Sequence, residues 1–150
     1  MNACVIGCIF GKEFQRVYPA VKNYDAYFFT NNQEMKPTLE EAGWKYIFID
    51  KPMSDDIAVS SLQSKYIKFL QFLKNDEFSF FNKYDRIVYA DHKLDLKDEH
   101  VEYLLERIGD SDILVRDHNR ERKSIWEEVE AAKRQERYLR FMPQTISAIA

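Results

Sequence analysis

Short apolar runs recur along this chain, and each is followed by a segment whose apolar residues have helical spacing. Most of the runs are continuous rather than alternating, which is typical of strands that are covered on both faces of a sheet. Alternating strands and helices favour an α/β fold, in which helices flank a mostly parallel sheet and right-handed crossovers join its strands. The predicted strands are residues 3–9, 24–30, 44–50, 86–91 and 112–116.

The segments between these runs predict helices. Thr38 and Asp98 are expected to be N-caps, and Gly43 and Gly109 are expected to follow the last turns of their helices. In segment 11–22, Pro19 interrupts the helical spacing, so a helix is expected to begin or break there. The predicted helices are residues 37–43, 60–73, 98–109 and 124–141. The second of them carries an apolar stripe of Leu62, Tyr66, Phe69, Leu70 and Leu73.

The composition is that of an ordinary globular protein, and 150 residues suit one domain, residues 1–150. A net charge of −3 gives no general argument for nucleic acid, and no apolar run is long enough to span a membrane. Cys4 and Cys8 lie four residues apart in one predicted strand, so their Cα atoms are about 13 Å apart, which is too far for a disulfide. Reduced thiols predict a cytoplasmic location.

Ligands of open α/β sheets bind beyond the carboxyl ends of the strands, so the strand tips are candidate sites. Gly7 and Gly11 at the first tip let the backbone approach a ligand, and Lys12 suits a phosphate or a ribose-side contact. A plain turn would have the same residues. Asn31 and Asn32 at the second tip can hydrogen-bond a base or ribose, although asparagines are also common in turns.

The start of the helix predicted over residues 60–73 is a candidate anion site. Ser60, Ser61 and the free N–H groups of the helix start supply donors, and Lys65 and Lys68 lie on the polar face. This combination can hold a diphosphate. A solvated amphipathic helix would have the same pattern.

The fourth tip carries the sharpest signal. Asp91 follows Ala90 at the end of an apolar strand, where a lone carboxylate is costly unless it is paired or binds a metal. The alternative is a charged turn before the helix that is predicted to start at Asp98. His92, Lys93 and Asp95 supply further ligands or counter-charges. The fifth tip is a basic cluster, either for a leaving group or on the surface, of Arg116, His118, Arg120, Arg122 and Lys123.

These tips resemble those of nucleotide-sugar glycosyltransferases of the GT-A fold, in which an Asp-x-Asp motif holds the ribose and a divalent metal on the diphosphate. The matching residues here are Asp91-His92-Lys93, so a lysine stands in place of the second acid. The wider pattern is similar to the plant-type TOD1/MUCI70-like glycosyltransferase family over residues 1–146. It comprises GCIFG, YDAYFFTNN, GWKYIFID, SKYIKFL and a segment from His118 to Glu128.

The resemblance implies a Rossmann-like GT-A nucleotide-diphospho-sugar transferase fold that transfers a hexose from UDP-glucose or UDP-rhamnose. Mn²⁺ or Mg²⁺ would bind at Asp91, and the acceptor would be a glycan on a glycoprotein, a capsid glycoprotein in viral members that act in the host cell cytoplasm. Domains of this family continue beyond this length, so we expect a C-terminally incomplete sheet and self-association. The residues expected to bind the nucleotide-sugar are Gly7, Gly11, Lys12, Asn31, Asn32, Ser61, Lys65, Ala90, Asp91, His92 and Lys93.

Other functions remain as alternatives. The main one is a non-catalytic Rossmann-like module that binds a nucleotide without transferring a sugar. A receiver-like signalling domain needs an acidic pair after its first strand, and Gly7-Cys8-Ile9 lacks one. A nuclease would be expected to have a broader basic face than this chain suggests. No residue stands out as a catalytic base, so the choice between inverting and retaining chemistry is open.

Overall fold

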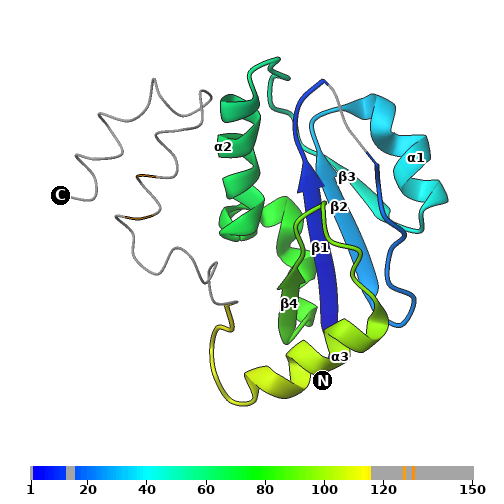
Figure 1. The fold of residues 1–150 in the computed structure, drawn as a ribbon, viewed down its shortest axis with the longest axis vertical. Helices are drawn as coiled ribbons and strands as arrows, with labels where there is room; N and C mark the ends of the chain where they lie inside the picture. Colours follow the sequence, from blue (N-terminus) through cyan, green and yellow to red (C-terminus); the bar gives the residue numbers. More distant parts are fainter. Residues whose placement is uncertain (1, 13–15, 116–126, 128–129, 131–150) are drawn as a thin grey trace. The chain divides into compact units, whose positions relative to one another are not determined.

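The computed structural model describes residues 2–12, 16–115, 127 and 130. The chain divides into two compact units, residues 1–110 and 111–150. In the first unit, the described residues form a four-stranded, wholly parallel sheet in the order β3-β2-β1-β4 (Figure 1). The expected α/β fold with a parallel sheet is therefore confirmed. The strands are β1 (Ala3–Ile9), β2 (Asp25–Thr30), β3 (Lys45–Phe48) and β4 (Arg86–Tyr89).

Helices cover both faces of this sheet (Figure 1). Successive residues of a strand point to opposite faces, so Ile6 and Cys8 of β1 pack on one side and Val5 and Ile9 on the other. The first face packs against α2 (Ile57–Lys68), η2 (Gln71–Lys74) and η3 (Asp76–Lys83). The second face packs against η1 (Gln33–Met35), α1 (Lys36–Glu41) and α3 (Asp98–Ile108).

Aromatic rings fill the core between the sheet and the α2 layer. Phe29 of β2 is fully buried, and its ring centroid lies 4.8 Å from that of Phe72. The Phe81 ring lies 5.2 Å from Phe72 and 6.0 Å from Phe29. These contacts join residues from β2, η2 and η3, so the α2 layer is held to the sheet by packing between segments that are distant in sequence.

Four of the predicted strands are confirmed, with ends that differ by at most two residues. The strand predicted over residues 112–116 is wrong in its described part, because residues 112–115 form no strand. Ile113 and Val115 are 75% and 73% exposed. A short β-branched run has high strand propensity, but it becomes a strand only where a partner strand pairs with it. The predicted helix 124–141 and the basic cluster after Val115 lie outside the described residues, except for Glu127 and Glu130.

The N-caps of α1 and α3 differ from the predicted residues. Met35 rather than Thr38 is the N-cap of α1, whereas Gly43 follows that helix with a φ of +92°, as expected. Lys97 rather than Asp98 is the N-cap of α3. The Asp98 carboxylate instead accepts backbone N–H groups of Lys22 and Asn23, at 3.1 and 2.9 Å. It therefore fixes the loop before β2. Residues 16–22 around Pro19 form no helix.

Helix α2 begins three residues earlier than predicted and ends at Lys68. Its fully buried side chains are Ala58 and Ile67, whereas Leu62 and Phe69 of the predicted stripe are 59% and 62% exposed. Leu70 has a left-handed φ of +59° and ends the helical spacing that the sequence suggested. The change of direction there lets the next segment bring Phe72 into the core.

Cys4 and Cys8 are buried and free, as expected. Burial raises the pKa of Cys4 to about 12 and that of Cys8 to about 11, so both are neutral thiols at pH 7. Among the described residues, no helix has the length and apolar character that a membrane crossing requires.

At the amino end of the sheet, Asp25 is the centre of a hydrogen-bond network. Its carboxylate accepts from Lys45 Nζ at 2.8 Å and from the Tyr84 hydroxyl at 2.5 Å. Tyr84 has one hydroxyl proton and donates it to Asp25, so the Tyr27 hydroxyl donates to Tyr84 at 2.6 Å. The hydrogen bond from Lys45, reinforced by that from Tyr84, lowers the pKa of Asp25.

This network predicts a loss of stability in acid that Asp25→Asn should remove. A carboxyl with a lowered folded pKa stabilises the fold above its unfolded pKa, near 3.8, and the stabilisation is lost as pH falls through the folded pKa. Its side chain is 40% exposed, so the effect should be below about 1 kcal/mol. Urea unfolding between pH 7 and pH 2.5 should show a shallower acid decline in the variant.

Asp95→Asn is the matched control, since Asp95 has the same exposure and a lysine partner, Lys97, at 3.0 Å, but no described tyrosine partner. An acid decline that is identical in the Asp25 variant and wild type would contradict the role of the network.

Candidate functional site

The order of the strands identifies a candidate ligand site on the carboxyl edge of the sheet. From β1 the chain adds β2 and β3 on one side and then crosses to place β4 on the other side of β1. Ligands of open parallel sheets bind where the strand order reverses in this way. The reversal lies between the carboxyl ends of β1 and β4. We call the group around it the switch-point site, comprising Cys8, Ser64, Lys65, Lys68, Tyr89 and Asp91.

β4 is short, which determines where Asp91 lies. Tyr89 pairs with Ile6, and the Ala90 N–H donates to the Ile6 carbonyl at 3.0 Å, so the chain leaves the sheet before β1 ends. Asp91 is therefore level with the last residues of β1 rather than with the loop at Gly11, and its charge acts on the Cys8 thiol.

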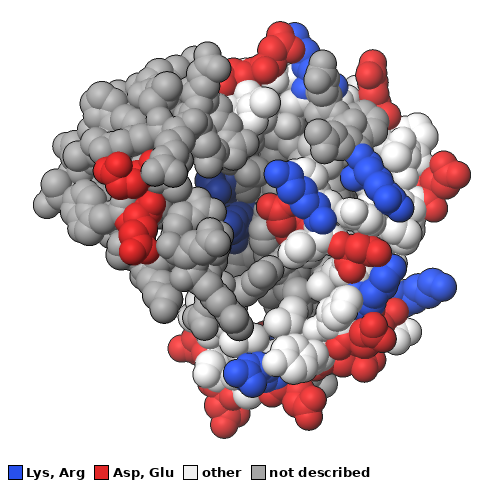
Figure 2. All heavy atoms as spheres, viewed as in Figure 1, with Lys and Arg blue, Asp and Glu red and all other residues white. Residues whose placement is uncertain are grey.

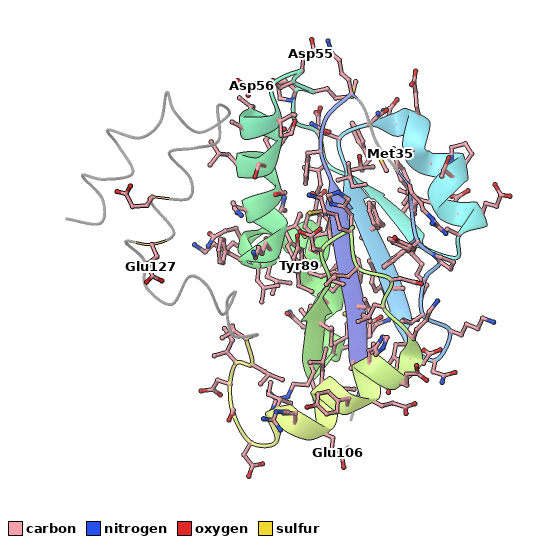
Figure 3. All side chains as sticks on the ribbon, in the orientation of Figure 1. Met35, Asp55, Asp56, Tyr89, Glu106 and Glu127 are labelled. Atoms are coloured by element: carbon pink, nitrogen blue, oxygen red, sulfur yellow. The ribbon has the colours of Figure 1, made fainter. Side chains whose placement is uncertain are left out.

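Two neutral polar groups, the Cys8 thiol and the Tyr89 hydroxyl, contact each other at the site. Cys8 Sγ lies 3.8 Å from the Tyr89 hydroxyl and 3.9 Å from the Ser64 carbonyl of α2. Figure 3 shows Tyr89 between α2 and β1. Burial raises the pKa of the Tyr89 hydroxyl as well as that of Cys8, so neither group carries charge near pH 7. Cys8 is consequently not an activated nucleophile.

Lys65 and Lys68 supply the positive charge. They lie three residues apart on α2, and both ammonium groups act on the Cys8 thiol. Partial burial, followed by repulsion from Lys68, lowers the pKa of Lys65, while the charge of Asp91 opposes this shift. Within the part of the chain that the structure describes, neither lysine forms an ion pair with a carboxylate.

Asp91 closes a turn and is exposed. Its Oδ1 accepts the Lys93 N–H at 3.0 Å, and its carbonyl accepts the Leu94 N–H at 2.9 Å. The side chain is 54% exposed, so the expectation that burial makes this carboxylate costly is wrong: β4 ends two residues earlier and leaves Asp91 in solvent. The structure contains the charged turn that was the alternative interpretation of this segment. The second carboxylate oxygen of Asp91, Oδ2, has no hydrogen-bond partner among the described residues.

His92 is less exposed than Asp91, and its Nδ1 lies 3.5 Å from Asp91 Oδ1. Burial lowers the pKa of His92 and outweighs the attraction of Asp91, so the imidazole is neutral at pH 7 and is no counter-charge. Asp95 pairs with Lys97 at 3.0 Å and does not join Asp91.

The two asparagines at the β2 tip hold the backbone together. Asn31 is 3% exposed, and its Oδ1 accepts the Gly11 N–H at 2.9 Å while its amide donates to the Pro52 carbonyl at 3.2 Å and to Gln63 Oε1 at 3.4 Å. Asn32, 2% exposed, accepts the Glu34 N–H at 3.0 Å and donates to the Gly11 and Lys12 carbonyls. Both amides are therefore engaged within the chain, which the residue types alone did not reveal.

The glycines and Lys12 also have structural partners. A Cβ on Gly7 would lie 3.2 Å from the Phe28 ring and 3.4 Å from the Ala90 carbonyl, so this glycine permits close packing below the strand tips. Gly11 has a φ of +119° and lies against Ser60. Lys12 pairs with Asp55 at 3.2 Å on the surface.

Ser60 and Ser61 do not lie at the start of α2, where the sequence placed them as anion donors. Asp56 caps the helix by accepting the Ala58 N–H at 2.9 Å, so Ser60 and Ser61 lie inside the helix. Figure 3 shows Asp55 and Asp56 at this end of the helix, where their charges oppose an anion. The Ser61 carbonyl accepts the Ser64 hydroxyl at 2.6 Å.

A small cleft on the other face of the sheet was missed by the sequence analysis. Its lining includes Tyr18, Phe28, Trp44, Ala90, Asp91 and His92. The Trp44 indole donates to the Tyr18 carbonyl at 2.8 Å, and the Trp44 and Phe28 rings pack edge to face with centroids 5.2 Å apart. Tyr18 lies in a loop and Trp44 just before β3, so no sequence pattern marks them as neighbours. His92 and Asp91 border this cleft, and Asp91 belongs to the switch-point site as well.

The structure thus places Ala90, Asp91 and His92 directly after β4 and Lys65 and Lys68 on α2, and contacts of Cys8 with Ser64 and Tyr89 link the two elements. Of the other predicted residues, Gly7 lies in β1 and Lys93 in the turn after β4, and the rest lie around the loop after β1, the β2 tip and the first turns of α2. On the face shown in Figure 2, acidic and basic side chains of the described residues are interspersed, and the described surface there has no broad basic area. A search of family models, curated proteins and solved structures finds no match to this chain.

Proposed function

We propose that this chain is a GT-A-type glycosyltransferase domain that binds a UDP-sugar at the switch-point site. The donor would be UDP-glucose or UDP-rhamnose, and the acceptor a glycan on a glycoprotein, such as a viral capsid glycoprotein. The observation that carries the proposal is that Asp91 follows β4 where the strand order of a parallel sheet reverses, while Ser64, next to Lys65 on α2, contacts Cys8 of the neighbouring β1.

These residues suit the two polar parts of a nucleoside diphosphate. Lys65 and Lys68 offer positive charge that no described carboxylate neutralises, as a diphosphate requires. The exposed Asp91 carboxylate has Oδ2 available to accept hydrogen bonds from ribose hydroxyls. When the bond between sugar and phosphate breaks, negative charge develops on the departing UDP, and nearby cations stabilise it.

The divalent cation that the resemblance implies does not fit the described donor set as a protein-built centre. No group of three or more His, Cys, Asp or Glu side chains gathers among the described residues. Asp91 would be the single carboxylate in contact with Mn²⁺ or Mg²⁺, because Lys93 replaces the second acid and Asp95 is paired with Lys97.

A non-catalytic nucleotide-binding module is the second candidate. The observation that favours it is that Asp91 is the one acid at the switch-point site among the described residues and already accepts the Lys93 N–H, so no second carboxylate there could act as a catalytic base. A module would bind UDP-sugars without hydrolysing them or transferring the sugar. Release of UDP from UDP-glucose or UDP-rhamnose, with and without a glycan acceptor, separates the two functions.

The proposal predicts that UDP binds more tightly than ADP or GDP, and that Asp91→Asn weakens UDP binding about tenfold, or about 1.4 kcal/mol. The substitution removes the anionic acceptor while nearly preserving its shape. Calorimetric titration with each nucleotide, with and without Mn²⁺, measures both effects. Asp95→Asn is the control and should leave the affinity unchanged, because Asp95 pairs with Lys97 outside the site. Equal affinities for UDP and ADP would refute the uridine donor, and an unaffected Asp91 variant would refute the site.

A further inference from the structure

We infer that Lys65 and Lys68 bind the diphosphate of the ligand directly, so that binding at the switch-point site requires no divalent cation. The inference rests on the proposed function and names how that site recognises its charged group. It follows from the arrangement of one lysine pair, one exposed carboxylate and a lysine at the position where a second acid would help to hold a metal.

The first step is the geometry of the lysine pair. A spacing of three residues places Lys65 and Lys68 on the same side of α2, and Ser64 beside them contacts Cys8 of β1. The contact between the Ser64 carbonyl and Cys8 places this part of α2 next to the carboxyl end of β1, and the charges of both lysines act on the Cys8 thiol. Like charges at this spacing destabilise a helix slightly. An anion held between them would relieve that repulsion.

The second step concerns the acids. Asp91 is the carboxylate whose charge acts on Lys65, yet no ion pair joins the two residues. Asp91 Oδ1 already accepts the Lys93 N–H. Asp95 is engaged with Lys97. Among the described residues, Asp91 therefore offsets the charge of Lys65 only through space, and no ion pair compensates either lysine.

The third step compares a metal with the lysines. Mg²⁺ is usually held by one or two carboxylates together with substrate phosphates and water, and here the single carboxylate lies on the same side of the fold as two ammonium groups, which repel a dication. The same two ammonium groups attract a diphosphate directly.

The experiment is calorimetric titration of the 150-residue chain with UDP and with inorganic pyrophosphate, in EDTA and in Mn²⁺. We expect UDP affinities in the two media to agree within about threefold. In EDTA, Lys65→Gln and Lys68→Gln should each weaken UDP and pyrophosphate about tenfold, and the double variant about a hundredfold. Lys74→Gln, in the exposed last turn of η2, is the matched control and should bind as wild type does. Thermal unfolding of each variant checks that it folds.

The outcomes separate the inference from the proposed function. Binding of UDP in Mn²⁺ alone, with no loss in the lysine variants, overturns the inference and leaves the proposed function intact. Lysine-dependent binding of pyrophosphate in EDTA, with no preference for UDP over ADP, supports the inference and refutes the uridine donor. Failure of both UDP and pyrophosphate to bind in either medium overturns both.

Discussion

Asn31→Ala is expected to lower the free energy of unfolding by about 3 kcal/mol, because the substitution removes three hydrogen bonds at a buried position. The Gly11 N–H would lose its acceptor inside the fold, and an unsatisfied buried donor costs about 1–3 kcal/mol by itself. Chemical denaturation monitored by circular dichroism measures the change.

Two variants test whether the contacts, rather than the residue type, carry this effect. Asn75→Ala removes an exposed N-cap whose amide oxygen accepts the Glu77 N–H at 3.2 Å, and it should cost about 1 kcal/mol. Asn31→Asp keeps the acceptor for Gly11 but loses both donors, so it should also destabilise the fold. If Asn31→Ala costs no more than Asn75→Ala, the asparagine does not hold the β1 and β2 tips together.

Gly11→Ala is expected to cost about 2–4 kcal/mol, from two sources that can be separated. A φ of +119° is unfavourable for a residue with a side chain, by about 1–3 kcal/mol. A Cβ would also lie 2.9 Å from Ser60 Oγ, so one of the two must shift. Denaturant unfolding of the variant measures the total effect.

Gly109→Ala isolates the backbone part, because Gly109 also has a positive φ, +51°, but a Cβ there would have no neighbour within 4 Å. Ser60→Ala in the Gly11→Ala background should recover the steric part, as a double-mutant cycle would show. Equal costs for Gly11→Ala and Gly109→Ala would mean that the contact with Ser60 contributes nothing. Because Gly11 lies outside the switch-point site, refolded Gly11→Ala should bind UDP with unchanged affinity.

The nucleotide-binding residues that the sequence proposed fall into two groups. Lys65, Asp91 and His92 lie at or beside the switch point, where a ligand contact remains proposed. Asn31, Asn32 and Gly11 have the right residue types for ligand contacts, but their polar groups bond one another and the backbone nearby. Residue type cannot distinguish these uses, because the same amide suits a ribose and a neighbouring peptide group.

The amino-acid sequence alone predicts the alternation of strands and helices, the parallel α/β fold and the burial of β1, since each depends on the periodicity of nearby residues. Which strand ends lie next to each other depends on the tertiary structure. β4 pairs with β1 across about 80 residues of chain, and the register that sets Tyr89 against Ile6 ends β4 early, exposes Asp91 and places it near Lys65. That register depends on packing between distant segments, which no local pattern encodes, so the switch-point site exists only once the sheet has formed.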